Sequence, residues 1–239
     1  SEMCIRDRDL VLVEFKEEAS LADEQAIQAD LSALVPDREE FNEAANATQT
    51  IVGFKNTKDN AEFVNSYSAD NYNDNYVFKS SFASDQADKI SGLAEGEIYG
   101  PYKESGFYKL SKMVSLKRIP DSAKVRHILT PFVGSTRADA SVTKTEAEAK
   151  TTADSIYKVL KRNRSKFKSL LSLSSDKVSN EKDGVIEFAY TAGFAPEFKA
   201  YSFKNPKGSL GVVRTDFGYH VIEILGQGTF QQAYKVATI

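Results

Sequence analysis

The chain of 239 residues has few of the side chains that most often carry chemistry: one cysteine, two histidines and no tryptophan. The single cysteine, Cys4, excludes an internal disulfide. No apolar run approaches the ~18 residues of a membrane-spanning helix, which predicts a soluble piece of protein. The net charge of −3 does not favour nucleic acid as a partner. The sequence also lacks a glycine-rich phosphate loop, a nucleophile elbow and a CxxC pair.

The first eight residues, SEMCIRDR, follow neither helical nor strand periodicity. We interpret residues 1–8 as an artefact and exclude them from the fold. The rest of the chain then has no cysteine, which suits an oxidising compartment.

Charge divides the chain into two halves. Residues 1–118 carry 13 basic and 22 acidic side chains, whereas residues 119–239 carry 18 and 12. This asymmetry predicts two units with different surfaces. In the first half, the patterns predict a strand at 10–15, a helix at 20–35, a loop at 56–76 and two strands within 95–116. Residues 117–123 resemble a linker.

The second half begins again with a strand, VRHILTPF, at 125–132. A long helix is predicted over 143–163, with Thr143 and Glu146 as its capping box. Further along, the patterns predict short helices at 165–175 and 195–203, a strand at 184–188, and a closing hairpin over 209–225.

The two halves also match each other at an offset of 112 residues, which places Gly96 on Gly208 and Gly106 on Gly218. We therefore predict an α+β fold with two tandem units, each a small, mainly antiparallel four-stranded sheet wrapped by helices. The units are residues 9–118 and 119–228, followed by a tail at 229–239. The alignment places His220 on Tyr108, so the polar features of the second copy are absent from the first.

The order of motifs in residues 123–226 resembles a parvulin-type peptidyl-prolyl cis-trans isomerase, with VRHIL, SSD, GVIEF, PEFKAYSF and TDFGYHVIEI in sequence. Residues 9–116 are similar to the degenerate unit of tandem foldase-chaperones. The sequence as a whole resembles the inner-membrane-anchored foldases of Bacteroidota-like bacteria. The resemblance implies a location in the bacterial periplasm or cell envelope, with any anchor outside this fragment.

Site residues are implied by the resemblance, motif by motif. Val185 takes the place of a family Leu and Phe194 that of a family Met, whereas Asp183 and Ile186 depart from family glycines. The implied catalytic residues are His127, Asp176, Thr215 and His220, and the implied substrate pocket consists of Val185, Phe194 and Phe198.

The resemblance further implies that the protein isomerises X–Pro bonds of unfolded or extended proline-containing polypeptides. It implies no cofactor, no nucleic acid, and no membrane contact by this fragment. A preference for phosphoserine before proline is not expected, because the loop at 131–142 offers Arg137 as its only basic side chain.

Four other interpretations stay open. The two histidines are ordinary core residues in the simplest of them. A metal site has little support, since the histidines lack helical i,i+4 spacing and no fourth ligand is evident. The departures at Asp183, Ile186 and Phe194 favour a non-catalytic chaperone that only binds extended chains. The last alternative is a structural module of a larger envelope assembly.

Overall fold

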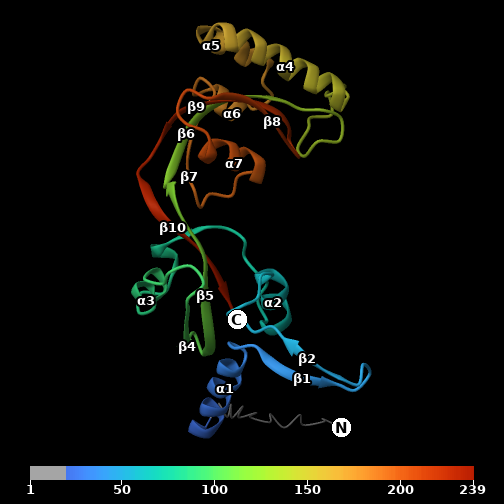
Figure 1. The fold of residues 1–239 in the computed structure, drawn as a ribbon. Helices are drawn as coiled ribbons and strands as arrows, with labels where there is room; N and C mark the ends of the chain where they lie inside the picture. Colours follow the sequence, from blue (N-terminus) through green and yellow to red (C-terminus); the bar gives the residue numbers. More distant parts are fainter. Residues whose placement is uncertain (1–19) are drawn as a thin grey trace, which may run out of the picture. The chain divides into compact units, whose positions relative to one another are not determined.

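The computed structural model describes residues 20–239, and its elements are shown in Figure 1. Cys4 and the strand predicted at 10–15 lie outside the described residues. The chain forms two compact units. Within the described part, the first comprises residues 20–74, 92–114 and 236–239, and the second comprises 75–91 and 115–235. No helix between residues 20 and 239 combines the length and apolar character needed to cross a membrane.

The first unit begins with helix α1 (Leu21–Ala33), which confirms the predicted helix and is capped by Ser20 and Asp23. Strands β1 (Arg38–Asn42) and β2 (Ala47–Ile51) form a separate two-stranded sheet. Helix α2 (Asn60–Tyr67) lies where a loop was predicted. The prediction was wrong because Asp59 caps the helix and two apolar side chains are buried among the polar residues that suggested a loop: Phe63 and Val64.

A four-stranded sheet has the order β3 (Val77–Phe78), β10 (Phe230–Thr238), β5 (Phe107–Pro120) and β4 (Ile98–Glu104). Strands β4 and β5 are joined by Ser105 and Gly106, which both have positive φ, as in a type I′ hairpin. The segment at 229–239, predicted as a tail, thus supplies a strand of this sheet. The proposed linker at 117–123 is also strand, since only Asp121 separates β5 from β6.

Two short elements precede β4: the 3-10 helix η1 (Lys79–Ser81) and helix α3 (Ala87–Ser91).

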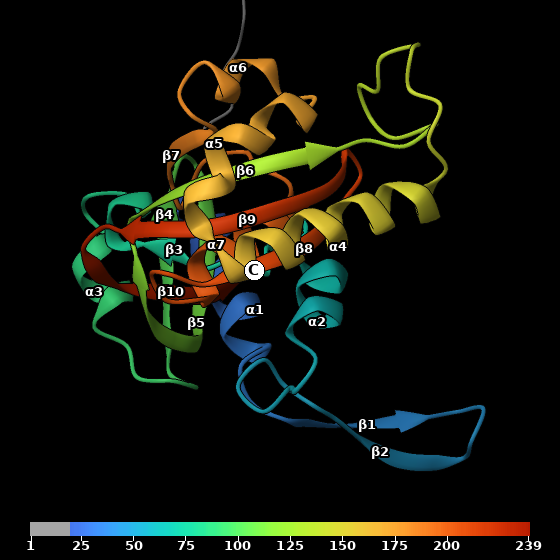
Figure 2. The ribbon, with the colours of Figure 1, turned by 90° about the horizontal axis from the view of Figure 1, so that it is seen from above.

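The second unit contains an antiparallel sheet with the order β7 (Val185–Ala189), β6 (Ser122–Thr130), β9 (Gly218–Gln227) and β8 (Leu210–Thr215). Helix α4 (Glu146–Arg162) and helix α7 (Pro196–Lys204) pack against this sheet (Figure 2). Side chains alternate along each strand: Val221 packs in the cluster that contains α4, whereas Ile222 packs with Phe198 of α7. The two helices therefore cover opposite faces of the sheet.

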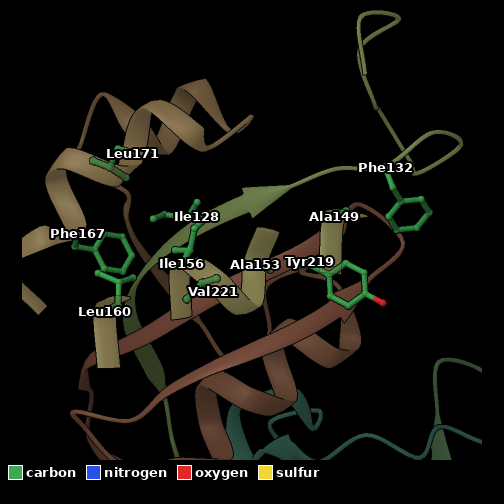
Figure 3. Packing of buried hydrophobic residues seen from close by; sticks show 10 residues of the cluster. All are labelled: Ile128, Phe132, Ala149, Ala153, Ile156, Leu160, Phe167, Leu171, Tyr219 and Val221. Atoms are coloured by element: carbon green, nitrogen blue, oxygen red, sulfur yellow. The ribbon is translucent and has the colours of Figure 1, made fainter. Parts of the chain in front are cut away.

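Helix α4 buries one stripe against the sheet (Figure 3). Its buried side chains recur every three or four residues, which is the helical period: Ala149, Ala153, Ile156 and Leu160. The capping box consists of Thr145 and Glu148, so the predicted pair Thr143 and Glu146 was placed two residues too early. Both pairs fit the same Thr-x-x-Glu pattern. The pair Thr145 and Glu148 is the one that stands directly before the buried stripe, which begins at Ala149.

Short elements connect α4 to β7. They are the 3-10 helices η2 (Arg164–Lys166) and η3 (Leu171–Leu173), and the helices α5 (Phe167–Leu170) and α6 (Lys177–Asn180).

The tandem duplication remains a prediction. Gly96 and Gly208, aligned by the sequence match, both have positive φ, and each precedes a hairpin. The two hairpins differ in register, however, because Glu104 pairs with Phe107 whereas Thr215 pairs with Gly218. The sheet of β3, β4 and β5 also includes β10 from the far end of the sequence.

Candidate active site

Two buried histidines lie side by side on neighbouring strands of the second sheet. His127 comes from β6 and His220 from β9, and the two residues are 2% and 6% exposed. Their Nδ1 atoms are 3.1 Å apart, and the rings stack with centroids separated by 5.3 Å. Both rings lie on the face covered by α7, because residues two apart in a strand share a face: His127 follows Val125 by two residues, and His220 precedes Ile222 by two.

Asp176 holds the outer side of His127. One carboxylate oxygen, Oδ2, lies 2.9 Å from Nε2 of His127, and the other accepts the backbone N–H of Ser179 as the N-cap of α6. The hydrogen bond from His127 keeps the pKa of Asp176 well below its usual range, against the opposing effect of burial. Asp176 is therefore an ionised acceptor at neutral pH.

Ser179 was not identified from the sequence, although its side chain is almost fully buried. Its hydroxyl lies 3.1 Å from Nε2 of His127, beside the Asp176 carboxylate. Its position three residues after an N-cap aspartate is the signal that could have indicated it.

Thr215 holds the outer side of His220. Its Oγ1 lies 2.9 Å from Nε2 of His220 and accepts the backbone N–H of Phe217 at 3.1 Å. Thr215 ends β8, and the tight connection to Gly218 brings its hydroxyl over the neighbouring strand.

The four side chains form one hydrogen-bonded chain: Asp176, His127, His220 and Thr215. The ionised Asp176 accepts only, so Nε2 of His127 donates to it. Between the two rings one Nδ1 atom donates to the other, and one hydrogen lies between Nε2 of His220 and Oγ1 of Thr215. Burial, together with the adjacent His127, lowers the pKa of His220 to about 3, so this ring is neutral at pH 7.

Aromatic side chains form an apolar wall beside the histidines. Phe198 of α7 meets both rings edge-on, with centroids 5.4 Å from His127 and 5.2 Å from His220. Phe194 stacks on Phe198 at 5.7 Å and contacts Phe188 at 4.2 Å. Pro196 at the first turn of α7 suits the start of a helix, and it sets Phe198 over the sheet.

These groups line a cavity of about 520 Å³, within the size range of small-ligand sites. Five predicted site residues line it: His127, Asp176, His220, Phe194 and Phe198. Thr215 is not part of the lining and contacts His220 instead. Val185 does not line it either. Its neighbour Ile186 does, because alternation along β7 turns Ile186 toward the Phe198 cluster.

The rim of the cavity carries mixed charge from the loop between β6 and α4 and from the start of α6. Arg137 lies with its guanidinium 5.8 Å from the ring of Phe217, and Asp139 follows it in the same loop. Lys177, which the sequence analysis did not single out, lies next to Asp176. Two cations and two carboxylates therefore surround the opening, without an excess of either sign.

Among residues 20–239, no group of three or more His, Cys, Asp or Glu side chains is arranged to hold a metal ion. The ligand-type side chains beside His127 instead hydrogen bond to its ring.

The family model of the PPIC-type PPIASE domain matches residues 108–228 of the chain, which include every residue of this site. The chain belongs to this family of peptidyl-prolyl isomerases. It is 27% identical to the chaperone SurA of Pseudomonas fluorescens (strain Pf0-1) in an alignment that covers 58% of the chain and 32% of the relative. The matched part thus spans about a third of the length of that curated relative.

Solved structures of isomerases are also similar to part of the chain. The peptidylprolyl isomerase PrsA from Bacillus anthracis shares 26% identity, covers 47% of this chain and 44% of its own, and gives a TM-score of 0.36. NmPin, the parvuline of Nitrosopumilus maritimus, shares 27% identity over 44% of this chain and 97% of its own, with a TM-score of 0.32.

Proposed function

We propose that residues 119–228 catalyse cis-trans isomerisation of X–Pro bonds in unfolded or extended polypeptides of the bacterial cell envelope, and so assist their folding. The observation that carries the proposal is the chain Asp176–His127–His220–Thr215, which lies against Phe198 in the wall of an apolar cavity. Family membership supports the same reaction.

The reaction requires no covalent step. Resonance holds the amide flat, and rotation meets a barrier of ~18–20 kcal/mol. A site that binds the twisted amide ~5 kcal/mol better than the planar one accelerates rotation by roughly 10³- to 10⁴-fold. The twisted amide is less polar, so transfer from water into the apolar cavity favours it over the planar form. Phe198, Phe194 and Ile186 hold the proline ring in place. The carbonyl group of the preceding residue X then rotates about the X–Pro bond.

The histidines act as positioning residues in this proposal. Each ring is already engaged at both nitrogens, which leaves neither ring a free lone pair to act as a base on the substrate. They fix Asp176 and Thr215 at the two ends of the network and present their edges to Phe198. The residues that contact the substrate are the apolar side chains and the Asp176 carboxylate at the cavity wall.

The first half, residues 9–118, is proposed to be a degenerate parvulin-like unit that binds clients without catalysis. It lacks the polar network, since Tyr108 stands at the aligned position of His220. One matching relative is named a chaperone, which favours a client-binding role. The periplasmic location and a membrane anchor beyond the fragment are likewise proposals from the family resemblance.

The proposal is tested by exchange spectroscopy on a series of short X–Pro peptides that differ only in X. We expect faster cis-trans exchange with the full chain and with residues 119–239 alone. A phosphoserine peptide should gain no advantage, because the opposed charges at the cavity rim cancel. If the folded protein accelerates the exchange of none of these peptides, the proposed isomerase activity is refuted.

A non-catalytic peptide-binding module is the second candidate, and Phe194 is the observation that favours it. This ring lines the cavity and packs between Phe188 and Phe198, so it occupies space that a smaller or more flexible side chain would leave to the substrate. Peptide-induced chemical shift changes around Phe198 without faster exchange would decide for this candidate. Phe194→Met should then restore exchange.

A further inference from the structure

Among residues 20–239, the β1–β2 hairpin of the first unit forms a sheet of two strands. No other strand of the described chain pairs with either β1 or β2, and both views show the turn end of the hairpin projecting away from the other elements of its unit (Figures 1 and 2). Neither strand contains a buried residue, and Phe41 is 57% exposed. An isolated two-stranded hairpin is only marginally stable in water, so this one gains from an added strand.

The two edges of the hairpin differ in how they are protected. Strand β1 carries three adjacent charges, Arg38, Glu39 and Glu40, and charged side chains are a common protection against edge pairing. Strand β2 reads Ala-Thr-Gln-Thr-Ile and has no charge, no proline and no glycine. Its two threonines and its isoleucine are β-branched residues that favour strand pairing. The open edge of β2 is therefore the one that accepts another strand.

The charge around this edge selects the partner. Between residues 20 and 74 the chain has three basic and eleven acidic side chains, a net charge of −8. Glu39 and Glu40 lie on the strand next to β2, and Glu43 lies in the turn between the strands. A second copy would bring the same negative charge to the edge, whereas a cationic strand would be attracted to it.

We propose that the free edge of β2 binds an extended, positively charged segment of polypeptide by strand addition. Backbone hydrogen bonds to residues 47–51 supply the affinity, and the surrounding carboxylates select basic side chains. The inference rests on the proposed function, because it gives the chain a second contact with the same extended polypeptides, outside the cavity of the second unit.

The probe is a short, proline-free peptide in which lysine alternates with threonine and valine, so that the isomerase site has no proline to bind. Binding at low salt should shift the NMR signals of residues 47–51 and slow the exchange of their amide hydrogens. N-methylation of alternate peptide amides should weaken binding by roughly tenfold or more, because it removes the donors of the added strand. A peptide with glutamate in place of lysine should bind no better than the N-methylated peptide.

Two variants locate the effect. Thr48→Lys places a charge on the open edge and should abolish peptide binding, whereas Ala45→Lys adds the same charge in the turn and should retain most of it. Phe198→Ala should leave binding of this peptide unchanged, even if X–Pro exchange is lost. Equal binding of the N-methylated peptide, or signal changes outside β2, would overturn the proposal. A dimer that forms without peptide and is abolished by Thr48→Lys would assign the edge to a second copy instead.

Discussion

At the scale of single residues, the site depends on one hydrogen-bonded chain that runs from Asp176 through the two histidines to Thr215. Substitutions at either end of this chain should affect the buried rings, because each one removes a hydrogen-bond partner from a histidine. The charged end at Asp176 also depends on pH, and so does the state of His220.

Replacement of Asp176 should reveal which of its roles stabilises the fold. Asp176→Ala leaves Nε2–H of His127 short of its main acceptor and uncaps α6, which should lower the free energy of unfolding by ~1–3 kcal/mol. Asp176→Asn keeps an amide oxygen at the same place and should cost less. Urea denaturation of the two variants checks this order; equal losses would contradict the assigned hydrogen bonds.

Stability should decrease with acid because of His220. Its pKa is depressed in the folded protein, from 6.5 to about 3, so the unfolded chain takes up the proton first. The stabilisation is therefore complete above pH 6.5 and is lost as the pH falls toward 3, by at most ~1.4 kcal/mol per pH unit. The lowered pKa of Asp176 acts in the same direction below its ordinary value of 3.8.

Urea midpoints at pH 7, 6 and 5 measure this loss. His220→Gln is the control, because it removes the titrating ring, and its stability should change less over the same range. Parallel pH curves for the variant and the unmodified protein would show that His220 is not the source.

At the scale of helices and strands, the site is assembled where β6 and β9 run side by side and the β8–β9 turn closes over them. Gly218 begins β9 with φ of +132°, and a Cβ there would lie 2.5 Å from the carbonyl oxygen of Thr130. This glycine therefore allows the close approach of the turn to β6 that sets Thr215 above His220.

Gly218→Ala should destabilise the protein by about 2 kcal/mol, through the strained φ and the clash with backbone. It should also displace Thr215 and shift the NMR signals of the His220 ring. Gly226→Ala in the same strand is the matched control, since its Cβ would meet nothing within 4 Å. Similar effects of the two substitutions on thermal unfolding would contradict a special role for Gly218.

Much of the second unit could be predicted from sequence because its signals are local. Helix α4, the closing hairpin and the two strands that carry histidines follow from periodicity and turn residues. The choice between Val185 and Ile186 could not, because a shift of one residue changes the face of the strand, and only the pairing of Ile186 with Val125 settles it. The same holds for β10, whose partners lie more than a hundred residues away.

At the scale of the whole molecule, strands β5 and β10 each run through both units of the described chain. The end of β10 completes the core of the first unit: Ala237 is fully buried there, and Ile239 exchanges two backbone hydrogen bonds with Leu110. The segment predicted as a tail is thus needed for the first unit, whereas the site residues all lie in the second.

Ala237→Asp should consequently unfold the first unit while leaving the histidine site intact, because it buries an unpaired carboxylate in that core alone. Loss of amide protection around Leu110, with unchanged ring signals for His127 and His220, is the expected NMR result. Gln232→Asp, on the exposed part of β10, should change neither. Simultaneous loss of both sets of signals would show that the two units do not fold separately.

The central claim is that the cavity beside the histidine pair lowers the barrier to X–Pro rotation. Its most direct test is the cis-trans exchange rate of one alanine–proline peptide, measured by NMR with the unmodified protein, with Asp176→Ala and with Phe198→Ala. We predict faster exchange with the unmodified protein and a loss of at least tenfold in each variant that remains folded. Exchange that stays at the uncatalysed rate with the unmodified protein, or that is unaffected by Phe198→Ala, would contradict the account.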